Sequence, residues 1–358
     1  MKLAIGFDPA GIENWPALAD YVIAAERLGI DSVWSIETWT ADAVTSLGYL
    51  AARTERIGLG TGIMQIGART PAMVAMTANA LARMSGGRFL LGLGVSGPQV
   101  VEGWHGVSFA RPLQRTRETV AIIRKAFSGE RVTHDGEIYR LPLPGGEGKA
   151  LAIGRRPPGD IPIYLATLGP KNLELTGELA DGWIGTSFFP EQAEVSFSHI
   201  AAGAARAGRT LADIDLQTSA GAVAFTDDEG AMTRLIAARK PGVAFYLGAM
   251  GSAETNFYND AWRRAGQEEV ARDVQRLWLD RQHTAAAARI PDDLILKCNL
   301  IGTEAMVRER LRVYRAAGLN TLRITPEGAT ADERLETLSR LIALVREVEA
   351  EPTGTAAS

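Results

Sequence analysis

Short apolar runs alternate along the chain with longer stretches in which apolar residues recur every three or four positions. The first such stretch has Leu18, Val22, Ala25 and Leu28 on one helical face and directly follows an apolar run over residues 3–7. The alternation continues to the last residues and predicts eight strands. We expect them at residues 3–7, 32–36, 56–63, 88–94, 161–166, 181–186, 215–225 and 320–325. Several of these runs are apolar throughout, which indicates strands with both faces buried.

Eight strands that alternate with eight helices predict the α/β class and, within it, a (β/α)8 TIM barrel. A doubly wound open sheet shares this alternation, and counting elements does not exclude it. The alternation is interrupted twice, so we expect insertions after strands four and seven. The first, over residues 95–160, is a loop with a hairpin that turns at Asp135 and Gly136. The second, over residues 226–300, is mostly helical. The barrel then forms a single domain over residues 1–350, followed by a frayed tail over 351–358.

Composition narrows the class of protein further. Of 358 residues, 46% are hydrophobic and 22% are charged, so the chain has enough apolar surface to fold and is not disordered. The net charge of −4 argues against a nucleic-acid partner. The single cysteine, Cys298, allows no internal disulfide and suits a reducing compartment. Apolar runs are all shorter than the ~18 residues of a membrane span, so we expect a cytoplasmic protein without membrane contact.

In a (β/α)8 barrel the working residues follow the carboxyl ends of the strands. After strand four, residues 92–97 match the G-x-G-x-x-G expression of dinucleotide-binding folds. Pro98 follows at once and no helix opens there, so the dinucleotide interpretation is disfavoured. The backbone N–H groups of Gly97 and Gln99, with the Ser96 hydroxyl, could instead hold an anion. A second candidate anion site follows strand five, where Gly169 precedes a helix that begins near Pro170.

Other catalytic patterns are missing from the sequence. It contains no nucleophile elbow, no phosphate-binding loop of the nucleoside-triphosphatase type and no zinc motif, and its four histidines are scattered. We therefore expect no metal site. Residues 51–90 contain five arginines and one acid, and among these arginines only Arg69 follows a strand at the functional end.

Several longer segments together resemble one family. They are VWSIE at residues 33–37, SLGYLAARTERI at 46–57, LGTGIMQ at 59–65, LGLGVSGPQVVEGWHG at 91–106 and ADGW at 180–183. These segments resemble the luciferase-like flavin and deazaflavin oxidoreductases, and within them the coenzyme F420-dependent branch of actinobacteria. The resemblance extends over nearly the whole chain.

The resemblance implies a barrel that holds a deazaflavin in its carboxyl-terminal mouth and moves a hydride to or from C5 of the cofactor. It also implies a cofactor site built from strand ends. Thr61, Gly62 and Ile63 would form a bulge with a cis peptide bond between Gly62 and Ile63, under the ring. Further contacts are implied for the side chain and phosphates of the cofactor, from Ser96, Gly97, Pro98 and Gln99 and from Thr167, Leu168 and Gly169, with Gly185 and Thr186 nearby.

One position departs from the family pattern. Several deazaflavin relatives have Asp-His after strand two, whereas this chain has Glu37 and Thr38. A threonine cannot replace an imidazole as a base near neutral pH. Glu37 is therefore the first candidate for the catalytic acid or base, and a hydrogen-bonding role toward the cofactor is the alternative. Asp8, after strand one, is the second catalytic candidate.

The predicted function is F420-dependent hydride transfer to or from a small organic substrate. Two alternatives stay open: an FMN-dependent monooxygenase that uses reduced flavin and oxygen, and a non-catalytic barrel that serves as a binding subunit. We expect the 226–300 insertion, with its aromatic residues, to cover the pocket and set specificity. We also expect a homodimer.

Overall fold

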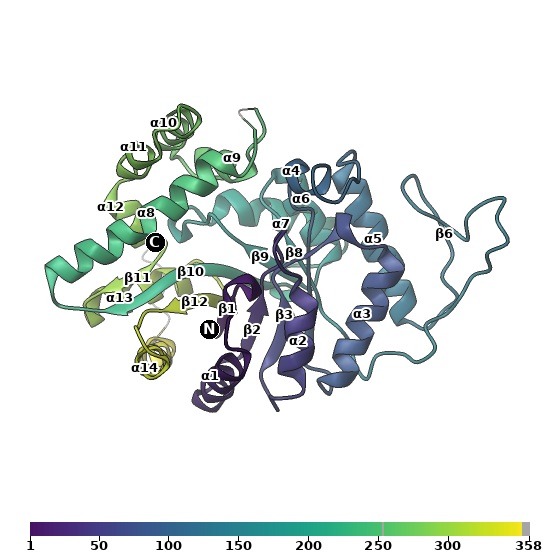
Figure 1. The fold of residues 1–358 in the computed structure, drawn as a ribbon, viewed down its shortest axis with the longest axis horizontal. Coiled ribbons are helices and arrows are strands. Elements are labelled where there is room, and N and C mark those ends of the chain that lie inside the picture. Colours follow the sequence, from purple (N-terminus) through teal and green to yellow (C-terminus); the bar gives the residue numbers. More distant parts are fainter. Residues whose placement is uncertain (253, 353–358) are drawn as a thin grey trace.

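The computed structural model describes residues 1–252 and 254–352, and its centre is a closed ring of eight parallel strands (Figure 1). The neighbouring strands pair in the order β1, β2, β3, β5, β8, β9, β10, β12, and β12 pairs with β1 to close the ring. This closure rejects the open-sheet alternative and confirms the predicted (β/α)8 barrel. The strands are β1 (Lys2–Phe7), β2 (Ser32–Ser35), β3 (Gly58–Thr61), β5 (Phe89–Gly94), β8 (Ile163–Ala166), β9 (Gly182–Gly185), β10 (Asp215–Phe225) and β12 (Thr321–Pro326).

One helix of the outer layer precedes or follows each strand (Figure 1). These helices begin at residues that suit a helix start. Asn14 caps the first and Thr70 the third, each with its side chain on a backbone N–H group of the first turn. The outer helices are α1 (Trp15–Leu28), α2 (Ala43–Ala51), α3 (Pro71–Met84), α5 (Pro112–Phe127), α6 (Pro170–Leu179), α7 (Glu194–Arg206), α13 (Glu304–Ala316) and α14 (Ala331–Ala350).

The inside of the barrel contains two aromatic rings, with glycines on the strands that make room for them, and aliphatic side chains packed around them. The rings of Trp34 and Tyr164 meet edge to face, with centroids 5.2 Å apart. A Cβ atom at Gly60 would collide with the Trp34 ring, and one at Gly182 would collide with the Tyr164 ring. Glycine at these two strand positions therefore allows close packing inside the barrel. Below the rings, the Tyr164 hydroxyl donates to Asp215 Oδ2 over 3.0 Å.

The segment after strand four contains α4 (Pro98–Val101), α5 and a two-stranded hairpin of β6 (His134–Asp135) and β7 (Arg140–Leu141). The hairpin projects beside α5, away from the ring of strands (Figure 1). Its predicted turn is wrong. Asp135 pairs with Arg140, so the loop consists of residues 136–139. The reason is a side chain of α5: the buried Glu118 carboxylate accepts the backbone N–H groups of Glu137, Ile138 and Tyr139.

In the described part of the insertion, five helices follow strand seven: α8 (Glu229–Ala249), α9 (Phe257–Arg264), α10 (Glu268–Leu279), α11 (His283–Ala288) and α12 (Asp292–Lys297). They have a core of their own, with Leu247, Trp262 and Val274 among its buried residues. The sequence did not predict the short strand β11 (Leu300–Gly302), which pairs with the end of β10. The predicted third strand also ends earlier than expected, and residues Met64–Gln65 form a separate strand, β4, beside β5. Of the predicted tail, residues 353–358 lie outside the described residues.

Candidate active site

The residues predicted for the site follow six different strands, and the parallel ring brings these strand ends to one rim. Asp8 follows β1 and Glu37 follows β2. The third, fourth, fifth and sixth strand ends carry the candidate cofactor residues, which are Thr61, Gly62 and Ile63, then Ser96, Gly97, Pro98 and Gln99, then Thr167, Leu168 and Gly169, then Gly185 and Thr186. The rim is thus the one place in the barrel where these distant segments meet.

The bulge expected at residues 61–63 lies at the end of β3. The peptide bond between Gly62 and Ile63 is cis, which confirms that expectation. Ile63 packs against the cluster inside the barrel, and a Cβ atom at Gly94 would lie only 3.0 Å from its Cγ1. Thr61 is fully buried, and its hydroxyl bonds to both the N–H and the C=O of Gly92. Thr61 therefore joins β3 to β5 behind the bulge.

The segment after β5 presents backbone donors. Ser96 has a left-handed conformation (φ 60°) and is half-buried, as are Gly97 and Pro98, while the Gln99 side chain is exposed. Within the described residues, the backbone N–H groups of Ser96 and Gly97 donate no hydrogen bond. Free donors on half-buried backbone suit an acceptor-rich ligand, such as the phosphate-bearing side chain of a deazaflavin.

The ends of β8 and β9 continue the rim. Thr167 is buried, with its hydroxyl 2.8 Å from that of Thr176. Gly169 precedes α6 without a capping side chain, so the first N–H groups of that helix lack a local acceptor. Gly185 is buried against the Trp183 ring, and Thr186 is half-buried. Small residues at these positions let a ligand approach the backbone closely.

Glu37 is held by four hydrogen bonds. Arg69 donates to Oε1 over 2.7 Å and to Oε2 over 2.8 Å, a bidentate ion pair. The backbone N–H groups of Gln65 and Ala43 donate to the same two oxygens over 2.9 and 3.2 Å. The Glu37 side chain is 4% exposed and that of Arg69 is 20% exposed. Each carboxylate oxygen thus already has two donors.

Asp8 differs from Glu37 in its exposure and in its hydrogen bonds. It is exposed, and within the described residues its Oδ1 accepts only the backbone N–H of Ala10, over 3.0 Å, at the start of a single turn of 3₁₀ helix (Pro9–Gly11). Ala4, which lies four residues earlier on β1, belongs to the cluster inside the barrel. Because strand residues alternate between faces, Asp8 follows the face of β1 that lines the barrel.

The helices after strand seven contact this rim. Arg264 of α9 donates to the backbone carbonyl of Leu168 over 2.9 Å. Phe257, at the start of α9, lies with its ring centroid 6.3 Å from that of Phe109 in the segment after strand four. The two insertions therefore touch each other above the carboxyl ends of the strands.

Sequence reasoning missed one charged residue at the rim. Arg323 lies on β12 between Thr321 and Thr325, and its Nη1 is buried with no hydrogen-bond partner among the described residues. Tyr246 of α8 and Tyr258 of α9 face it from the insertion, and burial raises the pKa of Tyr258 to about 12. The available signal was an arginine at an inward position of a barrel strand, where apolar or small residues are usual.

Several basic residues that could attract an anionic ligand have partners within the protein. Arg69 binds Glu37, and Lys171 lies 3.1 Å from Glu174. Arg88 donates to the backbone carbonyls of Ser85 and Ile57, among others. The local excess of arginine therefore serves the fold to a large extent.

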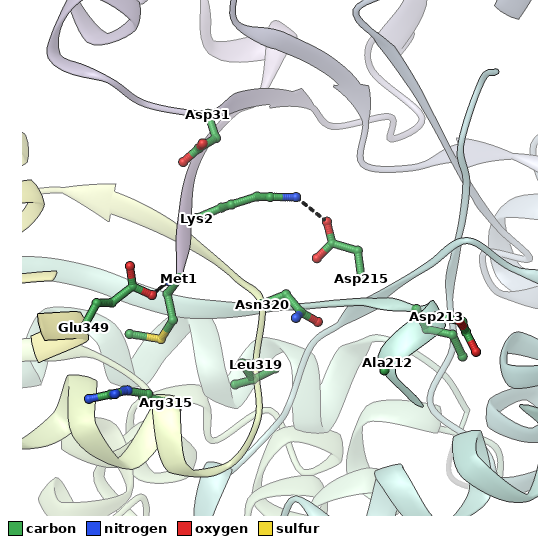
Figure 2. A pocket seen from close by; sticks show the side chains of 11 residues that line it. Met1, Lys2, Asp31, Ala212, Asp213, Asp215, Arg315, Leu319, Asn320 and Glu349 are labelled. Atoms are coloured by element: carbon green, nitrogen blue, oxygen red, sulfur yellow. Dashed lines mark hydrogen bonds and ion pairs between the residues drawn. The ribbon is translucent and has the colours of Figure 1, made fainter. Parts of the chain in front are cut away.

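A hollow lies at the opposite end of the barrel (Figure 2). Its volume is ≈ 690 Å³, and Figure 2 shows charged side chains from the amino ends of several strands around it. They include Lys2, Asp31 and Asp215, with Lys2 Nζ 3.5 Å from Asp215 Oδ2. None of the predicted site residues lines this hollow, and the amino end of a barrel is its structural end.

Comparison with known proteins identifies the family. The model of the family described as "Luciferase-like monooxygenase" matches residues 4–321. The chain belongs to this family, which confirms the resemblance deduced from its motifs. In the described part of the chain, no helix is long and apolar enough to cross a membrane.

Two relatives and one solved structure show which members of the family this chain is similar to. The "Putative coenzyme F420-dependent oxidoreductase Rv3520c" of Mycobacterium tuberculosis is 40% identical over 96% of this chain and 99% of that protein. A 5,10-methylenetetrahydromethanopterin reductase of Archaeoglobus fulgidus is 32% identical over 89% of this chain and 91% of its own length. The coenzyme F420-dependent tetrahydromethanopterin reductase of Methanopyrus kandleri has the same fold, with a TM-score of 0.77 at 24% identity over 94% of this chain and 97% of that one.

Proposed function

We propose that this protein is a coenzyme F420-dependent oxidoreductase that transfers a hydride between the cofactor and a small organic substrate. The observation that carries the proposal is the rim itself: a half-buried bulge, free backbone donors and small residues at neighbouring strand ends, in a chain 40% identical to a relative named for F420. When bound, the deazaflavin supplies hydride chemistry at C5.

In this proposal different strand ends at the rim bind different parts of the cofactor. Ile63 supports the ring from the end of β3. The free N–H groups of Ser96 and Gly97, with Pro98 and Gln99, hold the phosphate-bearing side chain, and Thr167, Leu168 and Gly169 continue that path. Gly185 and Thr186 complete it at β9. The protein's contribution is to orient the two reactants and exclude water.

The proton has two candidate carriers, and their surroundings favour different roles. Glu37 has both oxygens saturated by Arg69 and two N–H groups, which supports a positioning role in which it fixes the loop after β3. Asp8 has an oxygen that no other described residue engages, and it lies at the exposed end of β1. We therefore propose Asp8 as the group that gives or takes the proton.

We further propose that residues 226–300 cover the site, within one domain that extends over residues 1–350. The contact of Phe257 with Phe109 and the hydrogen bond from Arg264 to Leu168 support this arrangement. A cover that closes over the reactants would keep water from the hydride.

A homodimer is part of the proposal. One face of α3 exposes Met73, Met76 and Met84, each more than half exposed to solvent. Three large apolar side chains on one outer helix suit a self-complementary contact between two copies of the chain. Sedimentation of wild type and M76E tests it: the dimer should weaken in the variant, and a wild-type monomer at high concentration contradicts it. A cytoplasmic location stays a prediction, tested by cell fractionation.

Titration of the apo-protein with F420 and with FMN tests the cofactor. We expect saturable F420 binding that weakens as salt is added, because charged contacts are screened. A screen of reduced F420 against small carbonyl compounds and activated alkenes then reports hydride transfer. Tight FMN binding without F420 binding would favour the monooxygenase alternative, and binding without any turnover would favour a binding subunit.

A further inference from the structure

Arg323 is a cation inside the barrel mouth without a counterion. Its side chain runs past Gly6, where a Cβ atom would lie 3.5 Å from the Arg323 Cδ, so the neighbouring strand leaves room for the stem. Among the described residues it forms no ion pair and no hydrogen bond, and its Nη1 atom is buried. Two acids on or next to β10 and β12 have other partners. Glu327, just after β12, binds Arg239 over 2.8 Å, and Asp215 accepts from the hydroxyls of Tyr164 and Thr321.

Two tyrosines from the insertion lie near enough to this cation to act on its pKa. Tyr246 and Tyr258 lie on α8 and α9, with ring centroids 5.1 Å apart. Burial lowers the pKa of the Arg323 guanidinium, and the two nearby hydroxyls act in the opposite direction. Tyr246 is 46% exposed, so the cluster is reached from outside the barrel.

A charged nitrogen that is buried without a partner is costly, because its desolvation is not repaid. Such groups therefore point to a ligand that completes the site. The ligand is not the phosphate-bearing part of the cofactor in the proposed arrangement. That part follows strands four and five, whereas Arg323 lies on strand eight, on the opposite side of the ring from strand four.

We propose that Arg323, with the hydroxyls of Tyr246 and Tyr258, forms the subsite for a carboxylate group of the organic substrate. A guanidinium fork matches the two oxygens of a carboxylate, and two phenolic hydroxyls can donate to the same oxygens. One cation against one negative charge suits a carboxylate better than a phosphate dianion. The inference rests on the proposed function, because it assigns the substrate class of the same site.

The test is calorimetric titration with benzoate, its neutral analogue benzamide and inorganic phosphate, on apo-protein and on F420-loaded protein. We expect wild type to bind benzoate more tightly than benzamide or phosphate. R323M should weaken benzoate binding by roughly tenfold or more, the loss expected when charge-assisted hydrogen bonds are removed. R323K should weaken it less, and Y246F/Y258F should weaken it without abolishing it. R53M, which removes an exposed arginine paired with Asp20 on the outer layer, is the matched control.

Two further measurements separate the possible failures. Without ligand, R323M should unfold at the same or a higher temperature than wild type, because an unpaired buried charge is removed. Its affinity for F420 should stay within about threefold of the wild-type affinity. This change is much smaller than the one expected when a charge-assisted contact is lost. Equal affinity of wild type for benzoate and benzamide, or loss of F420 rather than benzoate binding in R323M, overturns the carboxylate subsite. Absence of F420 binding in wild type overturns the proposed function and leaves the benzoate result to stand alone.

Discussion

Replacing Glu37 by glutamine should destabilise the protein strongly, because Glu37 is the acceptor of four hydrogen bonds at the end of β2. The amide keeps the shape but turns one oxygen into an NH₂ group. In either orientation this group faces one Arg69 N–H and one backbone N–H, of Gln65 or Ala43. The NH₂ group then opposes two other N–H donors, and Arg69 loses its counterion.

The size of the effect follows from the burial of the pair. Removing one member of a buried ion pair costs about 3–5 kcal/mol. The carboxylate is 4% exposed but the guanidinium is 20% exposed, so water offsets part of the loss and the lower end applies. We expect E37Q to lose about 3 kcal/mol in the free energy of unfolding. R69M should lose a similar amount. The double variant E37M/R69M should lose about 2 kcal/mol less than the two single losses together, since the partners couple.

Urea unfolding of the three variants, with turnover of F420-loaded enzyme measured in parallel, checks this reasoning. If Glu37 positions the loop, E37Q and R69M impair turnover to similar extents, and the pH profile of the remaining activity is that of wild type. If E37Q stays within about 0.5 kcal/mol of wild type while its turnover falls by about 10²–10⁴-fold, the positioning role is wrong and Glu37 is the acid or base.

Three other predictions concern separate parts of the molecule. Burial alone would raise the pKa of Glu118, but the Gln114 side chain and the backbone N–H groups of residues 137–139 outweigh it and lower the pKa to about 2, so the carboxylate stabilises the fold. E118Q should therefore lose about 3 kcal/mol at pH 7, and the difference from wild type in pH-dependent urea unfolding should shrink as the pH falls from about 4.5 toward 2; a constant difference across that range contradicts it. D8N should lower turnover by about 10²–10⁴-fold with F420 affinity unchanged, and normal turnover would remove Asp8 from the mechanism. G60A should cost about 1–3 kcal/mol because a Cβ atom there meets the Trp34 ring, whereas G11A, with open space around it, is the control in the same thermal unfolding assay.

Much of the fold was predictable because its signals are local. The helical face of Leu18, Val22 and Ala25 and the apolar run at residues 3–7 each identify an element within a single segment. The family motifs extended this to the Gly62–Ile63 peptide bond, which is cis as expected. The strand ends that carry the predicted site residues followed in turn, since a parallel ring brings its carboxyl ends together.

The elements that sequence reasoning missed or misplaced depend on partners far away in the chain. The turn expected at Asp135 and Gly136 became a four-residue loop because Glu118, on α5 and 19 residues before Glu137, accepts its N–H groups. The strand β11 exists because the end of β10 offers it an edge to pair with. Neither partner leaves a trace in the local pattern of apolar and polar residues.

The sequence by itself determined the order of strands and helices, the two insertions and the family, because these depend on periodicity and on motifs within short segments. Only the tertiary structure decided how the charges are used. Within the described residues it paired Glu37 with Arg69 and left Arg323 without a counterion inside the barrel. A side chain's partner is set by where its strand lies in the closed ring, and that position is a property of the whole chain.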